Sequence, residues 1–203
     1  MKAVVMNEYG GPEVLKFTDY PDPTPGPGEV LIRVAAASIN PIDLLQRSGA
    51  TKDFFPVEFP GIIGRDVSGT VLELGPGVDK VSVGDKVFAL AFHTYAELCI
   101  VKANLLAKVP DDLDLVESAA LPLVTTTGNQ LISIASGIQS AQTVLVSGAL
   151  GSVGRAAIYT AKEKGARVIA GVRKSQLAEA KGLNADQVVA LDDDAAFDVL
   201  APV

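Results

Sequence analysis

The chain has 203 residues and a formal net charge of −7, with 24 acidic against 17 basic side chains. This charge argues against nucleic acid or an anionic membrane as a main partner, because both bind dense basic surfaces. No apolar run approaches the ~18 residues that a membrane span needs, and the first residues lack the apolar core of a signal peptide. Cys99 is the single cysteine, so no intrachain disulfide can form. We therefore expect a cytoplasmic protein with no membrane or nucleic-acid partner.

Short strand candidates succeed one another in residues 1–120, separated by turns rich in proline and glycine. One helix interrupts them at 40–47, where Asn40 is a good N-cap, Pro41 suits the first helical position and Asp43 favours the helix dipole. Short strands with frequent turn signals are typical of a barrel or sandwich. The expected strands are Lys2–Met6, Val14–Thr18, Val30–Ala36, Val67–Leu74, Lys86–Leu90 and Ala96–Val101.

From Val116 onward the pattern alternates between helix and strand. A helical bridging region covers Val116–Ala135 and is expected to break near Pro122. Three apolar strands follow, at Val144–Val146, Arg167–Gly171 and Gln187–Leu191. Continuously apolar strands that alternate with helices indicate a parallel sheet that is buried on both faces. The chain thus predicts a β domain over residues 1–120 and an α/β domain over residues 121–203.

A glycine-rich turn joins the first of these apolar strands to a helical pattern, and Gly165 stops the helix before the second strand. This strand–turn–helix–strand order is the context in which a glycine turn binds the pyrophosphate of a dinucleotide. Gly151 allows the backbone to approach the phosphates, Gly154 allows the helix to pack tightly on the strand, and the helix N-terminus attracts the anion. The expected contacts are Ala149, Leu150, Gly151, Ser152, Val153 and Gly154.

The end of the second strand distinguishes NADP from NAD. An NAD-binding unit normally places an acid there to accept a hydrogen bond from the ribose 2′-hydroxyl. This chain instead has Arg173, Lys174 and Ser175, and these suit a 2′-phosphate, which an acid would repel. The alternative is that Arg173 and Lys174 merely solvate the start of the next helix. We predict NADP(H) as the cofactor.

Motifs along the whole chain resemble those of the medium-chain dehydrogenase/reductase superfamily, specifically its zinc-free quinone oxidoreductase branch. The order and spacing of the motifs make the resemblance more specific than any one of them. It implies a GroES-like β domain on the substrate side, followed by a Rossmann domain for NADP(H). The motifs are MKAVV, PGPGEVLIRVAAASINPIDLLQRSG, FPGIIGRDVSGTV, GVDKVSVGDKVFAL, TYAEL and VSGALGSVG.

The residues also argue against the zinc chemistry of other members of that superfamily. Zinc-containing alcohol dehydrogenases have a Cys near the position of Asn40 and Gly-His-Glu where this chain has Gly64-Arg65-Asp66. A catalytic zinc usually takes three protein ligands from His, Cys and carboxylates, and the chain has one His, His93, and one Cys. We expect no metal, and we interpret His93 as a loop residue near the active-site cleft.

Without a metal, the expected reaction is hydride transfer from NADPH to a quinone or an α,β-unsaturated carbonyl. The resemblance implies that Asn40 and Asp43 lie at the pocket floor and that Thr127 borders the pocket. Tyr95 is a candidate to bind or protonate the substrate. Alternatives stay open: capping alone explains Asn40 and Asp43, a turn or cap would suit Thr127, and an aromatic residue in a β domain is more often core.

Three features separate the chain from the family pattern. Leu45 and Leu191 stand where the family often has a Tyr, which bears on substrate preference and on cofactor binding. The chain stops at Phe197–Val203, where the resemblance implies a fourth strand, so we expect an incomplete Rossmann domain, weak binding of adenosine-2′-phosphate-type ligands, little turnover and a homo-oligomer formed through an open sheet edge. Three functions stay open: a quinone reductase, a reductase of enones or alkenals, and a non-catalytic nucleotide-binding or structural protein.

Overall fold

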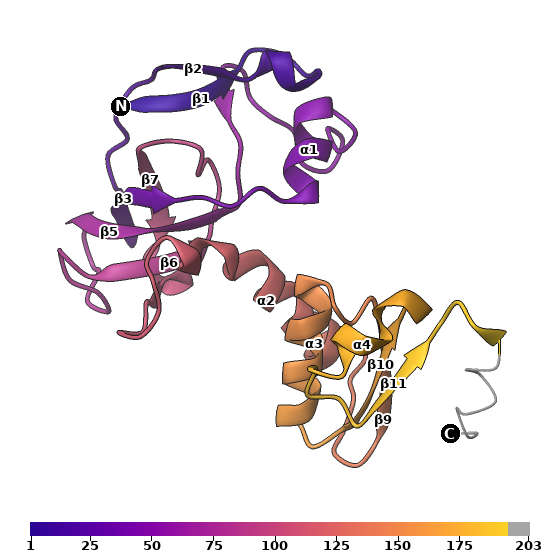
Figure 1. Cartoon of the computed structure of the whole chain (residues 1–203). Helices are drawn as coiled ribbons and strands as arrows, with labels where there is room; N and C mark the ends of the chain where they lie inside the picture. The colour runs from indigo at the N-terminus through magenta and orange to yellow at the C-terminus, as the bar shows by residue number, and fades with distance from the viewer. Residues whose placement is uncertain (195–203) are drawn as a thin grey trace. The chain divides into compact units, whose positions relative to one another are not determined.

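The computed structural model describes residues 1–194 (Figure 1). The chain divides into two compact units, Met1–Leu123 and Val124–Val203, the second described as far as residue 194. Each unit contains its own cluster of buried apolar side chains. No helix within the described residues has the length and apolar character that crossing a membrane requires.

The first unit is built from antiparallel strands. A five-stranded sheet has the order β7-β3-β5-β6-β8, and a three-stranded sheet has the order β2-β1-β4. An isolated bridge between Ala3 and Ala96 links the two sets of strands. The strands are β1 (Lys2–Met6), β2 (Lys16–Asp19), β3 (Glu29–Ala36), β4 (Gly61–Ile62), β5 (Asp66–Leu74), β6 (Lys86–Leu90), β7 (Leu98–Lys102) and β8 (Ala107–Lys108).

β-Branched residues on the central strands make the core of this unit. Val30 and Ile32 of β3 pack with Val67 and Val71 of β5 and Val87 of β6, and all five are buried. Branched side chains favour strands because they pack well on a pleated surface. The pairing of β3 with β5 shifts register twice along its length, so the two strands bend as they approach the residues of the candidate site.

The helix α1 (Pro41–Ser48) inverts the usual amphipathic arrangement. Its buried residues are Asp43 and Gln46, whereas Leu44 and Leu45 are 48% and 46% exposed. A surface helix normally turns its apolar stripe to the core and its polar face to water. Burial of the polar side chains therefore indicates that this helix is placed by a buried polar cluster rather than by apolar packing.

Most strands of this unit were predictable, and the exceptions have local causes. The predictions for Lys2–Met6 and Lys86–Leu90 are confirmed at both ends. The strand predicted from Val14 begins at Lys16, because Pro12–Val14 forms a short 3₁₀ turn with proline at its start. The two-residue strands β4 and β8 were not predicted, since two residues are too few to show alternation.

The second unit is a parallel three-stranded sheet with helices. Its order is β11-β10-β9, from β9 (Thr143–Ser147), β10 (Arg167–Val172) and β11 (Gln187–Ala190). The helix α3 (Ser152–Glu163) connects β9 to β10, and the short helix α4 (Leu177–Ala180) connects β10 to β11 (Figure 1). Buried residues of α3 and β10 share one core cluster, among them Ala157, Ala161, Val168 and Ala170.

The bridging region and the helix stop follow the sequence pattern. A 3₁₀ turn at Glu117–Ala120 is followed by α2 (Pro122–Gln130) and a π-helical turn at Leu131–Ala135, so the predicted break near Pro122 is confirmed. α3 ends at Glu163, and Gly165 has a φ of 73°, as a glycine stop requires. The prediction about Phe197–Val203 lies outside the described residues.

Candidate active site

Asp66, the first residue of β5, is the centre of a buried polar cluster in the first unit. It is completely buried. Its Oδ2 accepts hydrogen bonds from the Ser38 hydroxyl and, at 2.9 Å, from the Asn40 amide nitrogen, and its Oδ1 accepts from the Leu123 backbone N–H at 2.7 Å. A buried carboxylate is tolerated only when donors replace its water. Asp66 thereby connects the chain after β3 to the first turn of α2.

Asn40 and Asp43 take part in this cluster and also begin α1. Asn40 is the N-cap residue, and the Asp43 carboxylate accepts its backbone N–H at 2.8 Å, as in a capping box. The Asn40 amide nitrogen donates to the Ser38 hydroxyl at 3.0 Å as well as to Asp66. The capping explanation therefore holds for the helix start, and the same two side chains also belong to a buried polar cluster.

Tyr95 joins the cluster through the same carboxylate. Its hydroxyl donates to Asp43 Oδ2 at 2.8 Å and lies 3.3 Å from the Ser38 carbonyl oxygen. Gly64 makes room for the ring: its φ is 107°, and a Cβ there would lie 2.7 Å from the tyrosine Cδ1. The structure thus brings Tyr95 together with Asp43 and Asn40, which lie more than 50 residues earlier at the start of α1.

Burial shifts the proton affinities of this group. Burial raises the pKa of Asp43 above the ordinary aspartate value, and the nearby negative charge of Asp66 acts in the same direction. Burial and the hydrogen bond to Asp43 both raise the pKa of Tyr95. Tyr95 is therefore a neutral phenol at neutral pH, and Asp43 holds a proton more readily than an exposed aspartate does.

Arg65 is a buried cation next to this cluster. It is 8% exposed, and its Cζ lies 4.4 Å from the centre of the Phe92 ring and 4.9 Å from that of Phe55. Contacts of this kind stabilise a desolvated guanidinium. The sequence analysis considered Arg65 only as a replacement for a zinc ligand. The signal that could have found it is a charged pair, Arg65-Asp66, inside the otherwise apolar and glycine-rich run GIIGRDVSG.

His93 and Cys99 do not form a metal centre with their neighbours. His93 lies in a loop with part of its surface exposed, and the partial burial of its ring together with the charge of Arg65 lowers its pKa. Cys99 is buried, which raises its thiol pKa to about 12. Among residues 1–194, no three His, Cys, Asp or Glu side chains gather as a metal site. With Arg65 as a fixed cation and Asp66 occupied by three donors, the residues at Gly64–Asp66 do not fit zinc.

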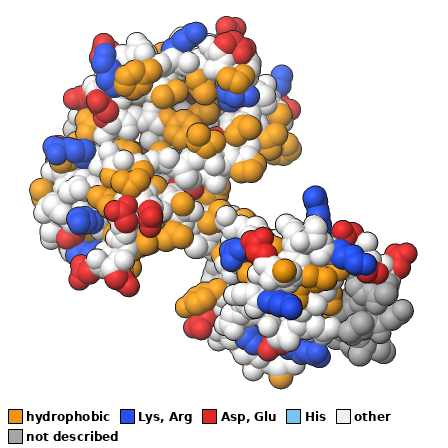
Figure 2. Space-filling view, viewed as in Figure 1, with side chains coloured by type: hydrophobic (Ala, Val, Ile, Leu, Met, Phe, Trp, Pro, Cys, Tyr) orange, Lys and Arg blue, Asp and Glu red, His pale blue; other side chains and the backbone are white. Residues whose placement is uncertain are grey.

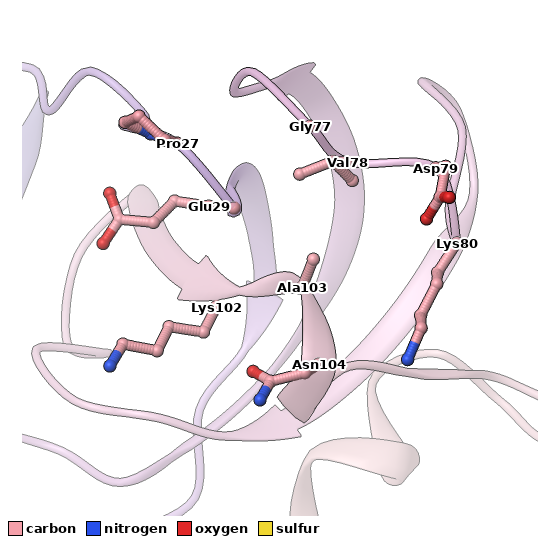
Figure 3. Close-up of a pocket in the computed structure, with 10 residues that line it drawn as sticks. Pro27, Glu29, Gly77, Val78, Asp79, Lys80, Lys102, Ala103 and Asn104 are labelled. Carbon is pink, nitrogen blue, oxygen red and sulfur yellow. The ribbon is translucent and has the colours of Figure 1, made fainter.

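The first unit contains cavities beside Arg65 and elsewhere. A cavity of about 220 Å³ is lined by Gln46, Phe54, Phe55, Pro56, Ile62, Ile63, Arg65, Phe92 and His93. A larger one, of about 580 Å³, shares five lining residues with it: Gln46, Pro56, Ile62, Phe92 and His93. Another hollow, of about 370 Å³, has Glu29 and Lys102 on one side and Asp79 and Lys80 on the other (Figure 3). Its lining contains none of the predicted site residues.

In the second unit, the glycine turn opens α3 as predicted. Gly151 is the N-cap residue, so the first helical N–H groups, those of Ser152, Val153 and Gly154, have no partner four residues back. A Cβ on Gly154 would lie 2.9 Å from the Ala149 Cα. The close approach predicted for Gly154 is therefore to the turn, and not to the strand as expected.

Two of the predicted contact residues already use their backbone N–H groups, one toward β10 and one within the turn. The Ala149 N–H donates to the Gly171 carbonyl at 3.2 Å, and the Gly151 N–H donates to the Gly148 carbonyl at 2.9 Å. The backbone carbonyl of Leu150 is also engaged, because it accepts a hydrogen bond from Arg155 Nε at 3.0 Å. Sequence reasoning missed Arg155, whose side chain fixes the turn. The donors best placed for an anion are those of the first turn of α3.

Arg173 and Lys174 follow β10 directly and are both exposed. Lys174 Nζ forms an ion pair with Asp193 at 2.8 Å, which raises its pKa, and the Lys174 backbone N–H donates to Asp192 at 2.6 Å. Two carboxylates therefore share the edge where the sequence predicted only cations. Arg173 is the better candidate to contact a 2′-phosphate.

Thr127, the remaining predicted residue, is half-buried in α2. It belongs to the second unit, whereas Asn40, Asp43 and Tyr95 belong to the first. The structure describes each unit by itself, so it does not bring Thr127 together with those three residues.

Comparison with known proteins places both units in one family. Residues 26–111 match the alcohol dehydrogenase GroES-like domain. A chloroplast envelope quinone oxidoreductase homolog from Arabidopsis thaliana is 35% identical over 93% of this chain and 60% of its own length. The human mitochondrial NAD(P)H oxidoreductase RTN4IP1 is 36% identical over 93% of this chain and 53% of its own. The chain thus spans little more than half the length of these relatives.

Solved structures agree with these sequence relatives. A mycobacterial protein, Rv1454c, solved in complex with NADPH, has a TM-score of 0.80 and 39% identity over 96% of this chain and 60% of its own. The quinone oxidoreductase from Coxiella burnetii has a TM-score of 0.82 and 33% identity over 100% of this chain and 66% of its own. The expected fold class, a GroES-like β domain with a Rossmann-like parallel sheet, is confirmed. The chain belongs to the medium-chain dehydrogenase/reductase superfamily, among the relatives named quinone oxidoreductases.

Proposed function

We propose that this protein is an NADPH-dependent oxidoreductase that transfers hydride to a quinone without zinc. The observation that carries the proposal is the glycine turn at the start of α3, with Arg173 at the end of the next strand. A phosphate-binding turn and a cation in this order suit NADP(H). The NADPH complex of Rv1454c and the names of the relatives support the same cofactor and acceptor.

NADPH, when bound, supplies the hydride, and the chain's own residues bind and orient it. The N–H groups of Ser152 and Val153, in the first turn of α3, would hold the pyrophosphate together with the positive end of the helix dipole. Arg173 would hold the 2′-phosphate. Lys174 contributes less, because its ammonium already pairs with Asp193.

The first unit would supply the proton. Reduction of a quinone to a hydroquinone adds one hydride and one proton, and no further proton is needed when the product leaves as a monoanion. The Tyr95 hydroxyl is a neutral donor held by Asp43, whose own proton affinity is raised by burial. The pair can pass a proton to a nearby oxygen, with Asp43 restoring it to the phenol.

An enone or alkenal is the second candidate acceptor. Its reduction needs one hydride and one proton, which the same pair could supply, so only the two acceptors compared in one assay can separate them. We keep the homo-oligomeric state and the cytoplasmic location as predictions; several relatives carry chloroplast or mitochondrial names.

The direct test is NADPH oxidation by the purified protein, with a simple quinone and an enone as separate acceptors. We expect NADPH binding by fluorescence, slow quinone-dependent oxidation, well under one zinc per chain by elemental analysis, and no effect of a chelator. Tyr95→Phe should slow oxidation roughly tenfold to a hundredfold, because general acid catalysis contributes on that order. Tyr159→Phe, on the exposed face of α3, is the matched control. Binding with no turnover of either acceptor would instead indicate a non-catalytic binder.

The second prediction concerns the choice of cofactor. Arg173→Ala should weaken NADPH binding about tenfold to a hundredfold, because a charge-assisted hydrogen bond contributes roughly 1.5–3 kcal/mol. Lys174→Ala should weaken it less, since Asp193 already neutralises that side chain. Neither change should alter NADH binding. Titration of the variants with both cofactors checks this, with the exposed Lys164→Ala as control. Equal losses for NADPH and NADH would show that these residues do not contact the 2′-phosphate.

The third prediction concerns pH and the stability of the first unit. Because burial raises the pKa of Asp43, the folded chain binds this proton more tightly than the unfolded chain does. The resulting stability is fully present below the ordinary aspartate pKa of about 3.9 and is lost as pH rises through the raised value. The free energy of unfolding of the wild type should therefore fall relative to that of Asp43→Asn across this range. Urea unfolding at several pH values measures the difference, and a constant or rising difference would contradict the account.

A further inference from the structure

Arg65 has hydrogen-bonding capacity that the described part of the chain does not use. Its Nε and Nη2 are both buried, and neither has a hydrogen-bond partner among residues 1–194. The rings of Phe55 and Phe92 contact the guanidinium, but an aromatic ring is a poor substitute for an oxygen acceptor in the plane of the N–H groups. A buried donor without an acceptor is costly, and more so when it is charged.

The acid whose charge acts on this cation, Asp43, does not neutralise it by contact. Asp43 interacts with Arg65 electrostatically, yet no ion pair within 4.0 Å joins them among the described residues. Asp43 Oδ2 already accepts from Asn40 and Tyr95. Arg65 thus remains a buried cation that has no direct counter-ion in this part of the molecule.

The cavity of about 220 Å³ beside Arg65 has the composition of a small ligand site. Phe54, Phe55 and Phe92 contribute apolar walls, and Gln46 and His93 are its other polar side chains. Its lining contains no carboxylate, so Arg65 sets the sign of its charge. Figure 2 shows hydrophobic side chains gathered on the surface of this unit, and several of the exposed ones belong to α1 and the turn after it.

We propose that Arg65 and this cavity form a binding site for a small planar carboxylate with an apolar body. The two free nitrogens, Nε and Nη2, carry parallel N–H bonds along one edge of the guanidinium, which matches the two oxygens of a carboxylate. A single oxygen would satisfy only one of them. The aromatic walls would cover the apolar body of the ligand.

Entry to this site involves one side chain. The two nitrogens are covered in the structure, so a carboxylate reaches them only when a neighbouring group moves aside. Phe55 is the candidate, because it lies in the turn after α1 and is 44% exposed. The site goes beyond the proposed reductase activity and needs no cofactor. Binding of a carboxylate to it is therefore measured without NADPH.

The experiment compares benzoate with benzamide, which has the same shape and no charge. Each is titrated into the ¹⁵N-labelled chain while the Arg65 side-chain Nε–H signal, identified by its loss in Arg65→Lys, is followed by NMR. We expect benzoate to shift this signal and to bind at least tenfold more tightly than benzamide. Arg65→Lys should weaken benzoate at least tenfold, because an ammonium cannot offer two parallel N–H bonds. Arg33→Met, which removes an exposed arginine on β3, should leave the affinity unchanged.

Three results would overturn the proposal. The first is no shift of the Arg65 signal by benzoate at millimolar concentration in the wild type, a result that does not depend on any variant folding. The second is benzamide binding as tightly as benzoate, which would show that the site does not select for the negative charge of a carboxylate. The third is an equal loss of affinity in Arg33→Met. If the wild-type chain binds benzoate as expected but does not oxidise NADPH with either acceptor, only the proposed function is contradicted.

Discussion

A buried carboxylate that must keep all of its hydrogen bonds is the constraint on which the first unit depends. Asp66 has no contact with water, so the Ser38 hydroxyl, the Asn40 amide and the Leu123 N–H have to stay in place around it. Loss of any one leaves part of a buried charge uncompensated, at a cost of several kcal/mol when the charge is fully exposed to an apolar interior. This requirement fixes the start of α1 and, through it, the position of Asp43.

Burial of Asp66 also has an electrostatic consequence for the acid next to it. Asp66 and Asp43 are both buried acids, and their mutual repulsion and desolvation favour a proton on Asp43. Tyr95 is held in its neutral form by the same environment. Perturbed proton affinities in a cluster of this kind are a usual property of functional sites. The inverted burial on α1, with Asp43 inside and leucines outside, is the structural expression of the same arrangement.

The sequence predicted features that depend on neighbours in the chain. The apolar period located the strands of both units, and the glycine turn located the start of α3, because each pattern lies within one segment. The role of Asp66 could not be predicted, since its partners Asn40 and Leu123 lie 26 and 57 residues away. Nor could the Lys174–Asp193 pair, which forms only when β10 and β11 lie side by side.

The most direct test of this account is a double-mutant cycle between Asn40 and Asp66. Free energies of unfolding are measured for Asn40→Ala, Asp66→Ala and the double variant by urea titration. Tyrosine fluorescence in a Tyr159→Phe background reports on the first unit alone, because the chain has no Trp and its other tyrosines, Tyr9, Tyr20 and Tyr95, lie there. The account predicts a coupling free energy of about 1 kcal/mol or more, as for a buried hydrogen bond to a charge. Additive effects, with coupling below about 0.3 kcal/mol, would contradict it.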